Sequence, residues 1–329
     1  MKAVLIKNYG QADQLYIGDY EQPQPQSHEL LIKVQATAVN RADIAQREGH
    51  YPSPADASPL MGLELAGIVE KVGDRVTKWK EGDRVFGLLG GGGYAEYAVI
   101  PESMAMELPD NMAFTTAAAI PEVFLTAYQT LFWVGRLQKG ERVLIHAGAS
   151  GVGTAAIQLA KQAGAEVVAT AGSEGKLEAC RHFGADLAIN YKTDAFDKVI
   201  EANYGANSID VILDFIGASY WEKNEKVIAM DGRHVLISTL GGAKINTFHL
   251  GRLMAKRATV TGTTLRSRSL EYKERLTDEF AIWALPLFKA GKITPVVDRV
   301  FPIEKVKEAH EYMEANKNIG KIVLSMTTH

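Results

Sequence analysis

Residues 142–176 constrain the fold most, because they combine an apolar strand, a glycine turn, a helix and a second strand in one unit. The β-branched run 143–145 is typical of a buried parallel strand. Gly148, Gly151 and Gly153 follow, where a backbone must bend sharply and let a pyrophosphate approach the amides of a helix start. The unit therefore predicts an α/β doubly wound sheet that binds a dinucleotide.

The glycine spacing is G-x-x-G-x-G rather than the commoner G-x-G-x-x-G. A strand-helix turn that binds no nucleotide is the alternative interpretation. The strand before the glycines and the helix after them favour the nucleotide site.

The end of the second strand indicates which cofactor fits. NAD enzymes place a carboxylate there for the ribose, but this segment ends in Ala171, Gly172 and Ser173, and Glu174 belongs to the next helix. Ser173 and Lys176 offer a hydroxyl and a cation to a 2′-phosphate, and Tyr191 offers another hydroxyl. Two such contacts at about 1.5–3 kcal/mol each favour the binding of NADPH over NADH by roughly two to four orders of magnitude in Kd. The alternative for Lys176 is a solvated helix lysine.

Composition allows two domains of ordinary size, since 47% of the 329 residues are apolar. The 36 basic and 39 acidic side chains nearly balance, so we expect neither nucleic acid nor a membrane surface as a partner. Residues 1–10 hold too short an apolar run for a signal peptide. The single cysteine, Cys180, excludes an internal disulfide and favours a cytoplasmic location, with its side chain packed in a helix.

The first 120 residues predict β structure, punctuated by an extended connector at 22–27 and a flexible hairpin tip at Gly90–93. Two helical pieces meet near Pro121, and later strands complete a six-stranded sheet. A long helix at 270–289, a short helix at 303–315 and flanking strands form a tail too small to fold alone, so it should rejoin the front domain. The expected strands cover 1–6, 30–39, 64–72, 83–89, 94–100, 187–191, 209–216, 233–239, 258–264, 299–303 and 321–326.

Several segments together resemble the medium-chain dehydrogenase/reductase superfamily over the whole chain: NRAD (40–43), GLELAGIVEKVG (62–73), GDRV (82–85), GASGVG (148–153) and YMEANKNIGKIVL (312–324). Within it, ASGVGTAAIQLA and SYWEKN are similar to the zinc-free quinone oxidoreductase branch that includes zeta-crystallin, and most of all to its tumour-suppressor-induced members. The resemblance implies a GroES-like β-rich catalytic domain over 1–123 and 266–329, a Rossmann NADPH-binding domain over 124–265, and an active cleft between them.

Zinc ligands of the alcohol dehydrogenase pattern are missing, so we expect no metal site. Asn40 stands where a cysteine ligand would be, and Leu63 replaces the histidine of GHE. Without a Lewis acid the acceptor must already be electrophilic, as quinones, ortho-quinones among them, and α,β-unsaturated carbonyls are.

Asn40 and Tyr51 are the candidate catalytic donors of hydrogen bonds, with Asp43 expected to fix their loop. A surface plug is the alternative for Tyr51, and a structural role near Gly320 is the alternative for Asn318. With the glycine turn, the resemblance assigns cofactor contacts to Thr126, Gly148, Ser150, Gly151, Val152, Gly172, Ser173, Lys176, Tyr191, Ile216, Gly217, Leu240, Gly241, Leu265 and Asn318.

Three functions remain open at this point: an NADPH-dependent quinone reductase, an enoyl or 2-alkenal reductase, and a non-catalytic NADPH-binding protein. The short β-branched segment 258–264 should lie at a sheet edge, which favours pairing into a homodimer.

The missing ligands lead to a test of metal content. We expect the purified protein to contain no stoichiometric zinc and to keep its activity after chelation, because its sequence supplies no thiolate and imidazole set. Metal analysis that finds one zinc per chain would contradict this.

Overall fold

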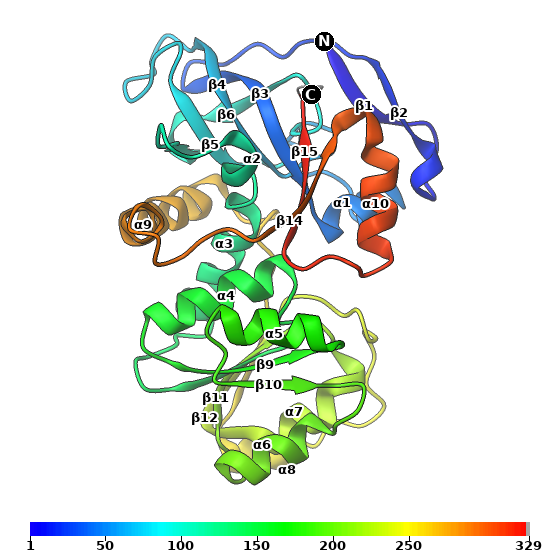
Figure 1. The fold of residues 1–329 in the computed structure, drawn as a ribbon, viewed down its shortest axis with the longest axis vertical. Coiled ribbons are helices and arrows are strands. Elements are labelled where there is room, and N and C mark those ends of the chain that lie inside the picture. The colour runs from blue at the N-terminus through cyan, green and yellow to red at the C-terminus, as the bar shows by residue number, and fades with distance from the viewer. Residues whose placement is uncertain (327–329) are drawn as a thin grey trace. The chain divides into compact units, whose positions relative to one another are not determined.

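The computed structural model describes residues 1–326, and the chain divides into two compact units. Unit 1 comprises Met1–Leu125 and the chain from Arg266 onward, while unit 2 comprises Thr126–Leu265. In Figure 1 unit 2 runs from green to yellow, and unit 1 holds the blue, cyan, orange and red segments. No helix within residues 1–326 is long and apolar enough to cross a membrane.

Unit 2 is built on a six-stranded sheet in which every pair of neighbours is parallel, in the order β10-β9-β8-β11-β12-β13. This confirms the doubly wound α/β sheet, with the change of direction between β8 and β11, and it places β13 at an edge. The strands are β8 (Arg142–Ile145), β9 (Glu166–Ala171), β10 (Leu187–Asn190), β11 (Ile209–Asp214), β12 (Ile228–Leu236) and β13 (Thr259–Gly262).

Helices cover both faces of this sheet, α4 and α5 on one and α6, α7 and α8 on the other (Figure 1). The alanine-rich α4 buries Ala155, Ala156 and Leu159 completely, because small side chains let the helix approach the strands closely. The helices are α4 (Gly151–Gln162), α5 (Glu174–His182), α6 (Phe196–Tyr204), α7 (Trp221–Val227) and α8 (Leu250–Lys256).

Unit 1 contains a seven-stranded sheet in the order β14-β15-β3-β4-β5-β7, with β6 also pairing with β3, and a separate β1-β2 hairpin. The strands are β1 (Lys2–Ile6), β2 (Leu15–Asp19), β3 (Glu29–Val39), β4 (Glu64–Val72), β5 (Arg84–Leu88), β6 (Tyr97–Pro101), β7 (Ala105–Glu107), β14 (Val297–Pro302) and β15 (Lys321–Ser325). The tail strand β15 pairs antiparallel with β3, so the C-terminal segment rejoins the front of the chain as predicted.

The helices of unit 1 include α1 (Arg41–Arg47), α2 (Phe114–Ala117), α9 (Leu270–Lys289) and α10 (Val306–Glu314). α3 (Pro121–Tyr128) continues into a π-helix (Gln129–Val134), so the segment near Pro121 holds three helical pieces rather than two. Pro121 starts α3, where a missing N–H costs no helical hydrogen bond. α9 has the predicted bounds.

The prediction of a flexible hairpin tip at Gly90–93 is wrong. Gly91 to Gly93 are buried, and β5 and β6 on either side do not pair with each other. A Cβ at Gly91 would lie 2.7 Å from the carbonyl oxygen of Leu60, and one at Gly93 would lie 2.5 Å from that of Glu64. The glycines therefore permit close packing of two backbones rather than mobility.

Candidate functional site

Most of the predicted cofactor residues of unit 2 follow the carboxyl ends of its strands. Because all six strands are parallel, these ends meet along one edge of the sheet, where doubly wound folds bind ligands. The residues that follow the strand ends are Gly148, Ser150, Gly151 and Val152 after β8, Gly172, Ser173 and Lys176 after β9, Tyr191 after β10, Ile216 and Gly217 after β11, Leu240 and Gly241 after β12, and Leu265 after β13. Thr126 is buried at the start of unit 2, within α3.

The turn after β8 is packed too closely to admit side chains. A Cβ at Gly148 would lie 2.9 Å from the Sγ of Cys180, and one at Gly153 would lie 2.6 Å from the oxygen of Gly148. Ala147 adopts the left-handed region with φ 49°, a strained conformation for a residue with a Cβ. Ser150 caps α4, since its Oγ accepts a hydrogen bond of 3.0 Å from the amide of Gly153. The result is a tight loop at a helix N-terminus, which fits a pyrophosphate.

Cys180, beneath this turn, is buried as predicted. Burial raises the pKa of its thiol to about 12, so the side chain packs as a small apolar group.

The tip of β9 is covered by two side chains from the end of β10. A Cβ at Gly172 would lie 2.6 Å from the Oη of Tyr191 and 3.2 Å from the Cε of Lys192. Ser173 is the residue directly before α5, yet its hydroxyl makes no capping hydrogen bond. Two hydroxyl groups, a helix N-terminus and a lysine thus lie close together at the end of β9. Lys192 is absent from the sequence-based prediction, although it directly follows Tyr191.

Asp214 shapes the loop after β11, and the sequence-based prediction does not include it. Its Oδ1 accepts hydrogen bonds from the amides of Ile216 (2.7 Å) and Gly217 (2.9 Å), and its Oδ2 accepts one from His234 (2.8 Å). Burial is the largest single effect and favours a higher pKa for Asp214. The hydrogen bond from His234, the nearby His146 and the amide of Gly217 together outweigh it, so the pKa lies below the ordinary value. The loop after β12 is tied to the same place, because the amide of Gly241 donates to the oxygen of Ile216 at 2.7 Å.

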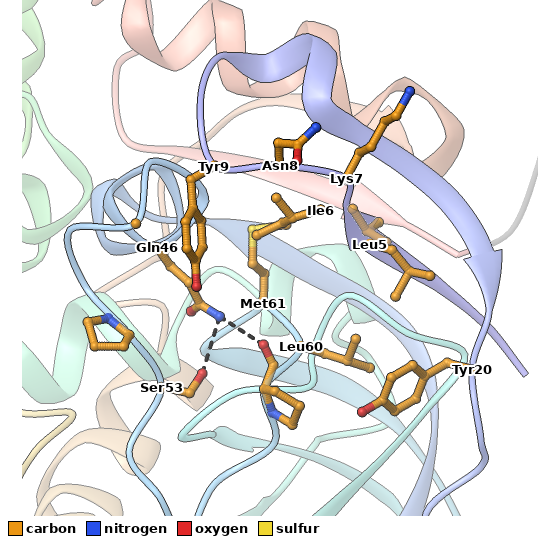
Figure 2. Close-up of a pocket in the computed structure, with 14 residues that line it drawn as sticks. Leu5, Ile6, Lys7, Asn8, Tyr9, Tyr20, Gln46, Ser53, Leu60 and Met61 are labelled. Atoms are coloured by element: carbon orange, nitrogen blue, oxygen red, sulfur yellow. Dashed lines mark hydrogen bonds between the residues drawn. The ribbon is translucent and has the colours of Figure 1, made fainter.

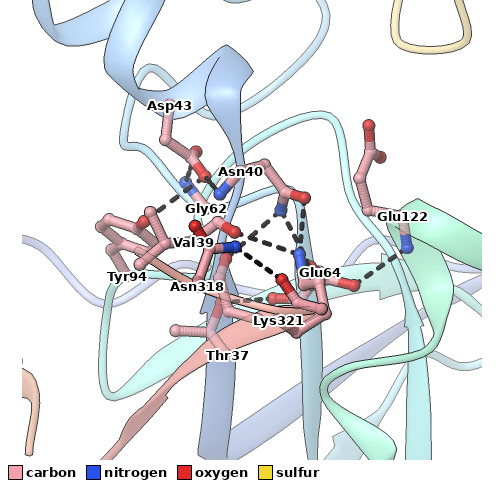
Figure 3. A network of polar contacts seen from close by, with 12 residues as sticks. Thr37, Val39, Asn40, Asp43, Gly62, Glu64, Tyr94, Glu122, Asn318 and Lys321 are labelled. Atoms are coloured by element: carbon pink, nitrogen blue, oxygen red, sulfur yellow. Dashed lines mark hydrogen bonds and ion pairs between the residues drawn. The ribbon is translucent and has the colours of Figure 1, made fainter. Parts of the chain in front are cut away.

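In unit 1, a buried polar cluster surrounds the ammonium of Lys321 (Figure 3). Its Nζ donates to the oxygen of Val39 (3.1 Å), to Asn40 Oδ1 (2.6 Å) and to Glu64 Oε1 (2.8 Å). The Asn40 amide nitrogen donates to Glu64 Oε1 at 2.8 Å and to the oxygen of Ala38 at 3.3 Å. We call Asn40, Glu64 and Lys321 the Lys321 cluster. The amide of Asn40, predicted to face the acceptor, is engaged within it.

Asp43 connects this cluster to the surrounding loops. Its carboxylate accepts hydrogen bonds from the amides of Asn40 (2.8 Å) and Gly62 (3.1 Å) and from the hydroxyl of Tyr94 (3.3 Å). Burial is the main reason that the pKa of Asp43 is raised to about 6. Asp43 therefore holds the chain around Asn40, in agreement with the role expected for it.

Glu122 lies at the start of α3 beside the cluster. Its amide donates to Glu64 Oε2 at 2.9 Å, but its carboxyl points away from Glu64 and Lys321 (Figure 3). Burial, followed by the charge of Glu64, raises the pKa of Glu122 to about 8, so the group keeps its proton at neutral pH. The sequence-based prediction does not include Glu122, although an acidic residue in the first turn of an otherwise apolar helix is a signal that could have indicated it.

Tyr51 lies in the loop after α1 and is held by Arg266. The guanidinium carbon lies 5.4 Å from the centroid of the Tyr51 ring, and the same side chain donates to the oxygen of Gly90 at 2.8 Å. Burial, together with the charge of Glu122, raises the pKa of the Tyr51 phenol. The phenol therefore stays protonated and can donate a hydrogen bond at neutral pH.

Asn318, the remaining predicted cofactor residue, belongs to unit 1. Its side-chain nitrogen donates to the oxygen of Gly320 at 2.7 Å. It does not end a helix, because α10 stops at Glu314 and the left-handed residue that follows is Asn316, with φ 54°.

Two family models match the chain. Residues 26–110 match the alcohol dehydrogenase GroES-like domain, and residues 151–281 match the zinc-binding dehydrogenase. The first match lies within unit 1 and includes the segment that carries Asn40, Tyr51 and Glu64.

Relatives and solved structures extend the likeness to the whole chain. The quinone oxidoreductase of Lama guanicoe is 33% identical over 98% of this chain and 97% of its own length. The crystal structure of Escherichia coli quinone oxidoreductase complexed with NADPH superposes with a TM-score of 0.89 at 28% identity, covering 99% of this chain and 100% of that one. The crystal structure of CurK enoyl reductase gives a TM-score of 0.86 at 30% identity, covering 99% of both chains.

The residues present do not fit the zinc that the second family model's description implies. Zinc prefers thiolate and imidazole ligands, but the ammonium of Lys321 lies between Asn40 and Glu64, and the single cysteine is in unit 2. Across residues 1–326 no group of three or more His, Cys, Asp or Glu side chains could hold a metal ion.

The burial of the Lys321 cluster leads to a stability prediction. Lys321→Met should lower the free energy of unfolding by about 3–5 kcal/mol, because it leaves the Glu64 carboxylate buried without its cation. Urea denaturation followed by circular dichroism measures the change. The added substitution Glu64→Gln should recover part of the loss.

Lys2→Met is the matched control, since it removes one partner of the exposed pair between Lys2 and Asp19 (2.7 Å) and should change little. If Lys321→Met is no more destabilising than this control, the cluster does not contribute as described.

Proposed function

Because the chain belongs to the medium-chain dehydrogenase/reductase superfamily, with the quinone oxidoreductases, we propose that it is an NADPH-dependent quinone oxidoreductase that works without zinc. The observation that carries the proposal is the Lys321 cluster. An ammonium has three hydrogens, and here Val39, Asn40 and Glu64 accept all of them. Neither zinc nor this lysine can then polarise the oxygen of an acceptor.

The cofactor would lie along the carboxyl edge of the unit 2 sheet. The N-terminus of α4, capped by Ser150, would hold the pyrophosphate, and the loops fixed by Asp214 would hold the adenosine and nicotinamide sides. When bound, NADPH supplies the hydride. The 2′-phosphate would contact Ser173, Lys176, Tyr191 and Lys192, which supports NADPH over NADH.

The acceptor must be electrophilic before it binds, since no Lewis acid is available to activate it. Quinones meet this condition because the added charge spreads over a conjugated ring. Two groups of unit 1 can donate hydrogen bonds to the acceptor's oxygens at neutral pH: the phenol of Tyr51 and the protonated carboxyl of Glu122. The Asn40 amide is committed to Glu64, so we assign Asn40 the role of holding the cluster rather than contacting the acceptor.

An enoyl or 2-alkenal reductase is the second candidate, and the match to CurK enoyl reductase favours keeping it. An activated carbon-carbon double bond satisfies the same electrophilic requirement as a quinone.

Acceptor profiling tests the proposed function. With NADPH, we expect ortho-quinones such as phenanthrenequinone to be reduced with a higher kcat/KM than 2-alkenals, because both quinone oxygens can accept hydrogen bonds from unit 1. NADPH oxidation at 340 nm measures both acceptor classes under identical conditions. Faster turnover of 2-alkenals would select the enoyl reductase, and a bound cofactor with no turnover of either class would indicate a binding protein.

Lys192 provides a test of cofactor choice. Lys192→Glu should raise the Kd for NADPH about 10–100-fold, because one charge-assisted phosphate contact is replaced by repulsion, while the Kd for NADH stays unchanged. Fluorescence titration with each cofactor measures the two constants.

Lys198→Glu is the control, since Lys198 lies on α6 and pairs with Glu201 instead. If Lys192→Glu weakens the binding of NADPH and NADH equally, the lysine does not contact the 2′-phosphate.

A further inference from the structure

A cavity lies in unit 1, between the β1-β2 hairpin and the loop 46–61 (Figure 2). Its volume of about 640 Å³ is in the usual range for small-molecule sites, about 300–1,000 Å³. Tyr51 is not among the residues that line it. None of the roles assigned above uses this cavity.

The walls of the cavity are apolar and aromatic. Leu60 and Met61 are buried and form part of the lining, and the rings of Tyr9 and Tyr20 stand on opposite sides of the cavity (Figure 2). Tyr9 is 72% exposed and Tyr20 is 38% exposed, so both rings present surface that a ligand could cover. Two aromatic rings beside an apolar surface favour a flat aromatic ligand.

Hydroxyl groups in the lining can donate hydrogen bonds to a ligand. Ser53 Oγ accepts hydrogen bonds from Gln46 Nε2 (3.2 Å) and from Arg266 Nη2 (2.8 Å), so its own hydrogen is the one left to donate. The hydroxyl groups of Tyr9 and Tyr20 make no hydrogen bond within residues 1–326. Gln46 is already committed, because its Nε2 also donates to the oxygen of Pro59 at 3.0 Å.

The cavity contributes no charge to a ligand. The only charged residue in its lining among those described is Lys7, and its ammonium points away from the cavity (Figure 2). Hydroxyl donors without a fixed charge suit a neutral molecule with acceptor oxygens.

We propose that this cavity is a second ligand site, which binds a neutral, flat aromatic molecule bearing carbonyl oxygens. The aromatic frame lies between Tyr9 and Tyr20 over Leu60 and Met61, and a carbonyl oxygen accepts the hydrogen of Ser53. The site is distinct from the acceptor site proposed around Tyr51.

Hydrogen bonds of Arg266 link the cavity to the Tyr51 loop. Ser53 and Gln46 line the cavity, and both accept hydrogen bonds of 2.8 Å from Arg266 Nη2. Arg266 in turn contacts the ring of Tyr51 and donates to its backbone oxygen at 3.4 Å. A ligand that takes the hydrogen of Ser53 makes its Oγ a better acceptor and so strengthens the bond from Arg266.

The binding experiment uses 1-tetralone, a neutral aryl ketone, with the whole protein and without NADPH. We expect saturation-transfer NMR to report binding with a Kd of roughly 0.1–1 mM, the range for a ligand of this size. Tyr20→Ala, which removes one aromatic wall from an exposed position, should weaken binding at least fivefold. Ser53→Ala should also weaken it.

Tyr16→Ala is the matched control, because Tyr16 is an exposed tyrosine of the same hairpin that does not line the cavity, and it should leave binding unchanged. Absence of binding would overturn the proposal. So would binding that Tyr20→Ala leaves intact and Tyr51→Phe weakens, since the ketone would then occupy the acceptor site. No cofactor or turnover enters this test, so its outcome is independent of the proposed quinone reductase activity.

Discussion

The ion pair between Lys321 and Glu64 is the constraint on which unit 1 depends. Lys321 begins β15, Val39 ends β3 and Glu64 begins β4, and these three strands are neighbours in one sheet. A buried ammonium is tolerated only when acceptors surround it, so the three strand ends must meet at one point. In the chain, Lys321 is 257 positions from Glu64 and 282 positions from Val39. The front of the chain therefore cannot complete its polar core until the tail has folded onto it.

The same pair arranges the groups that could meet a substrate. Glu64 Oε2 accepts the amide of Glu122 and so fixes the first turn of α3. The negative charge of Glu64, added to burial, keeps the carboxyl of Glu122 protonated at neutral pH. Arg266 holds the Tyr51 loop, because it contacts the tyrosine ring and donates a hydrogen bond to the backbone oxygen of Tyr51. Two neutral hydrogen-bond donors, Tyr51 and Glu122, thus lie beside a buried ion pair and a buried arginine.

The sequence predicted what depends on local pattern. Six parallel strands followed from apolar β-branched runs, and the helix 270–289 followed from a continuous helical period between clear ends. The glycine turn was predicted because its backbone geometry depends on glycines that lie close together in the chain. The Lys321 cluster was not, since no periodicity relates residues more than 250 positions apart. Gly90–93 were misread because a run of glycines has the same composition whether it bends freely or lets another backbone approach. Lys192 was missed because its closeness to Gly172 joins the ends of two neighbouring strands. Asp214 was missed because its partner His234 lies on the next strand, although its bonds to the amides of Ile216 and Gly217 are local.

A zinc ion and an ammonium differ in whether they can activate an acceptor, and this difference explains why the proposed acceptor must already be electrophilic. A catalytic zinc keeps an open coordination position, whereas the three hydrogens of Lys321 are all directed at protein oxygens. The cluster can therefore shape the site but cannot share its charge with a developing alkoxide. The proposed donors Tyr51 and Glu122 offer only neutral hydrogen bonds. A charge spread over a conjugated system needs less stabilisation than one confined to a single oxygen, so neutral donors suffice for it. Selectivity in such a site follows the electron affinity of the acceptor before it follows its shape.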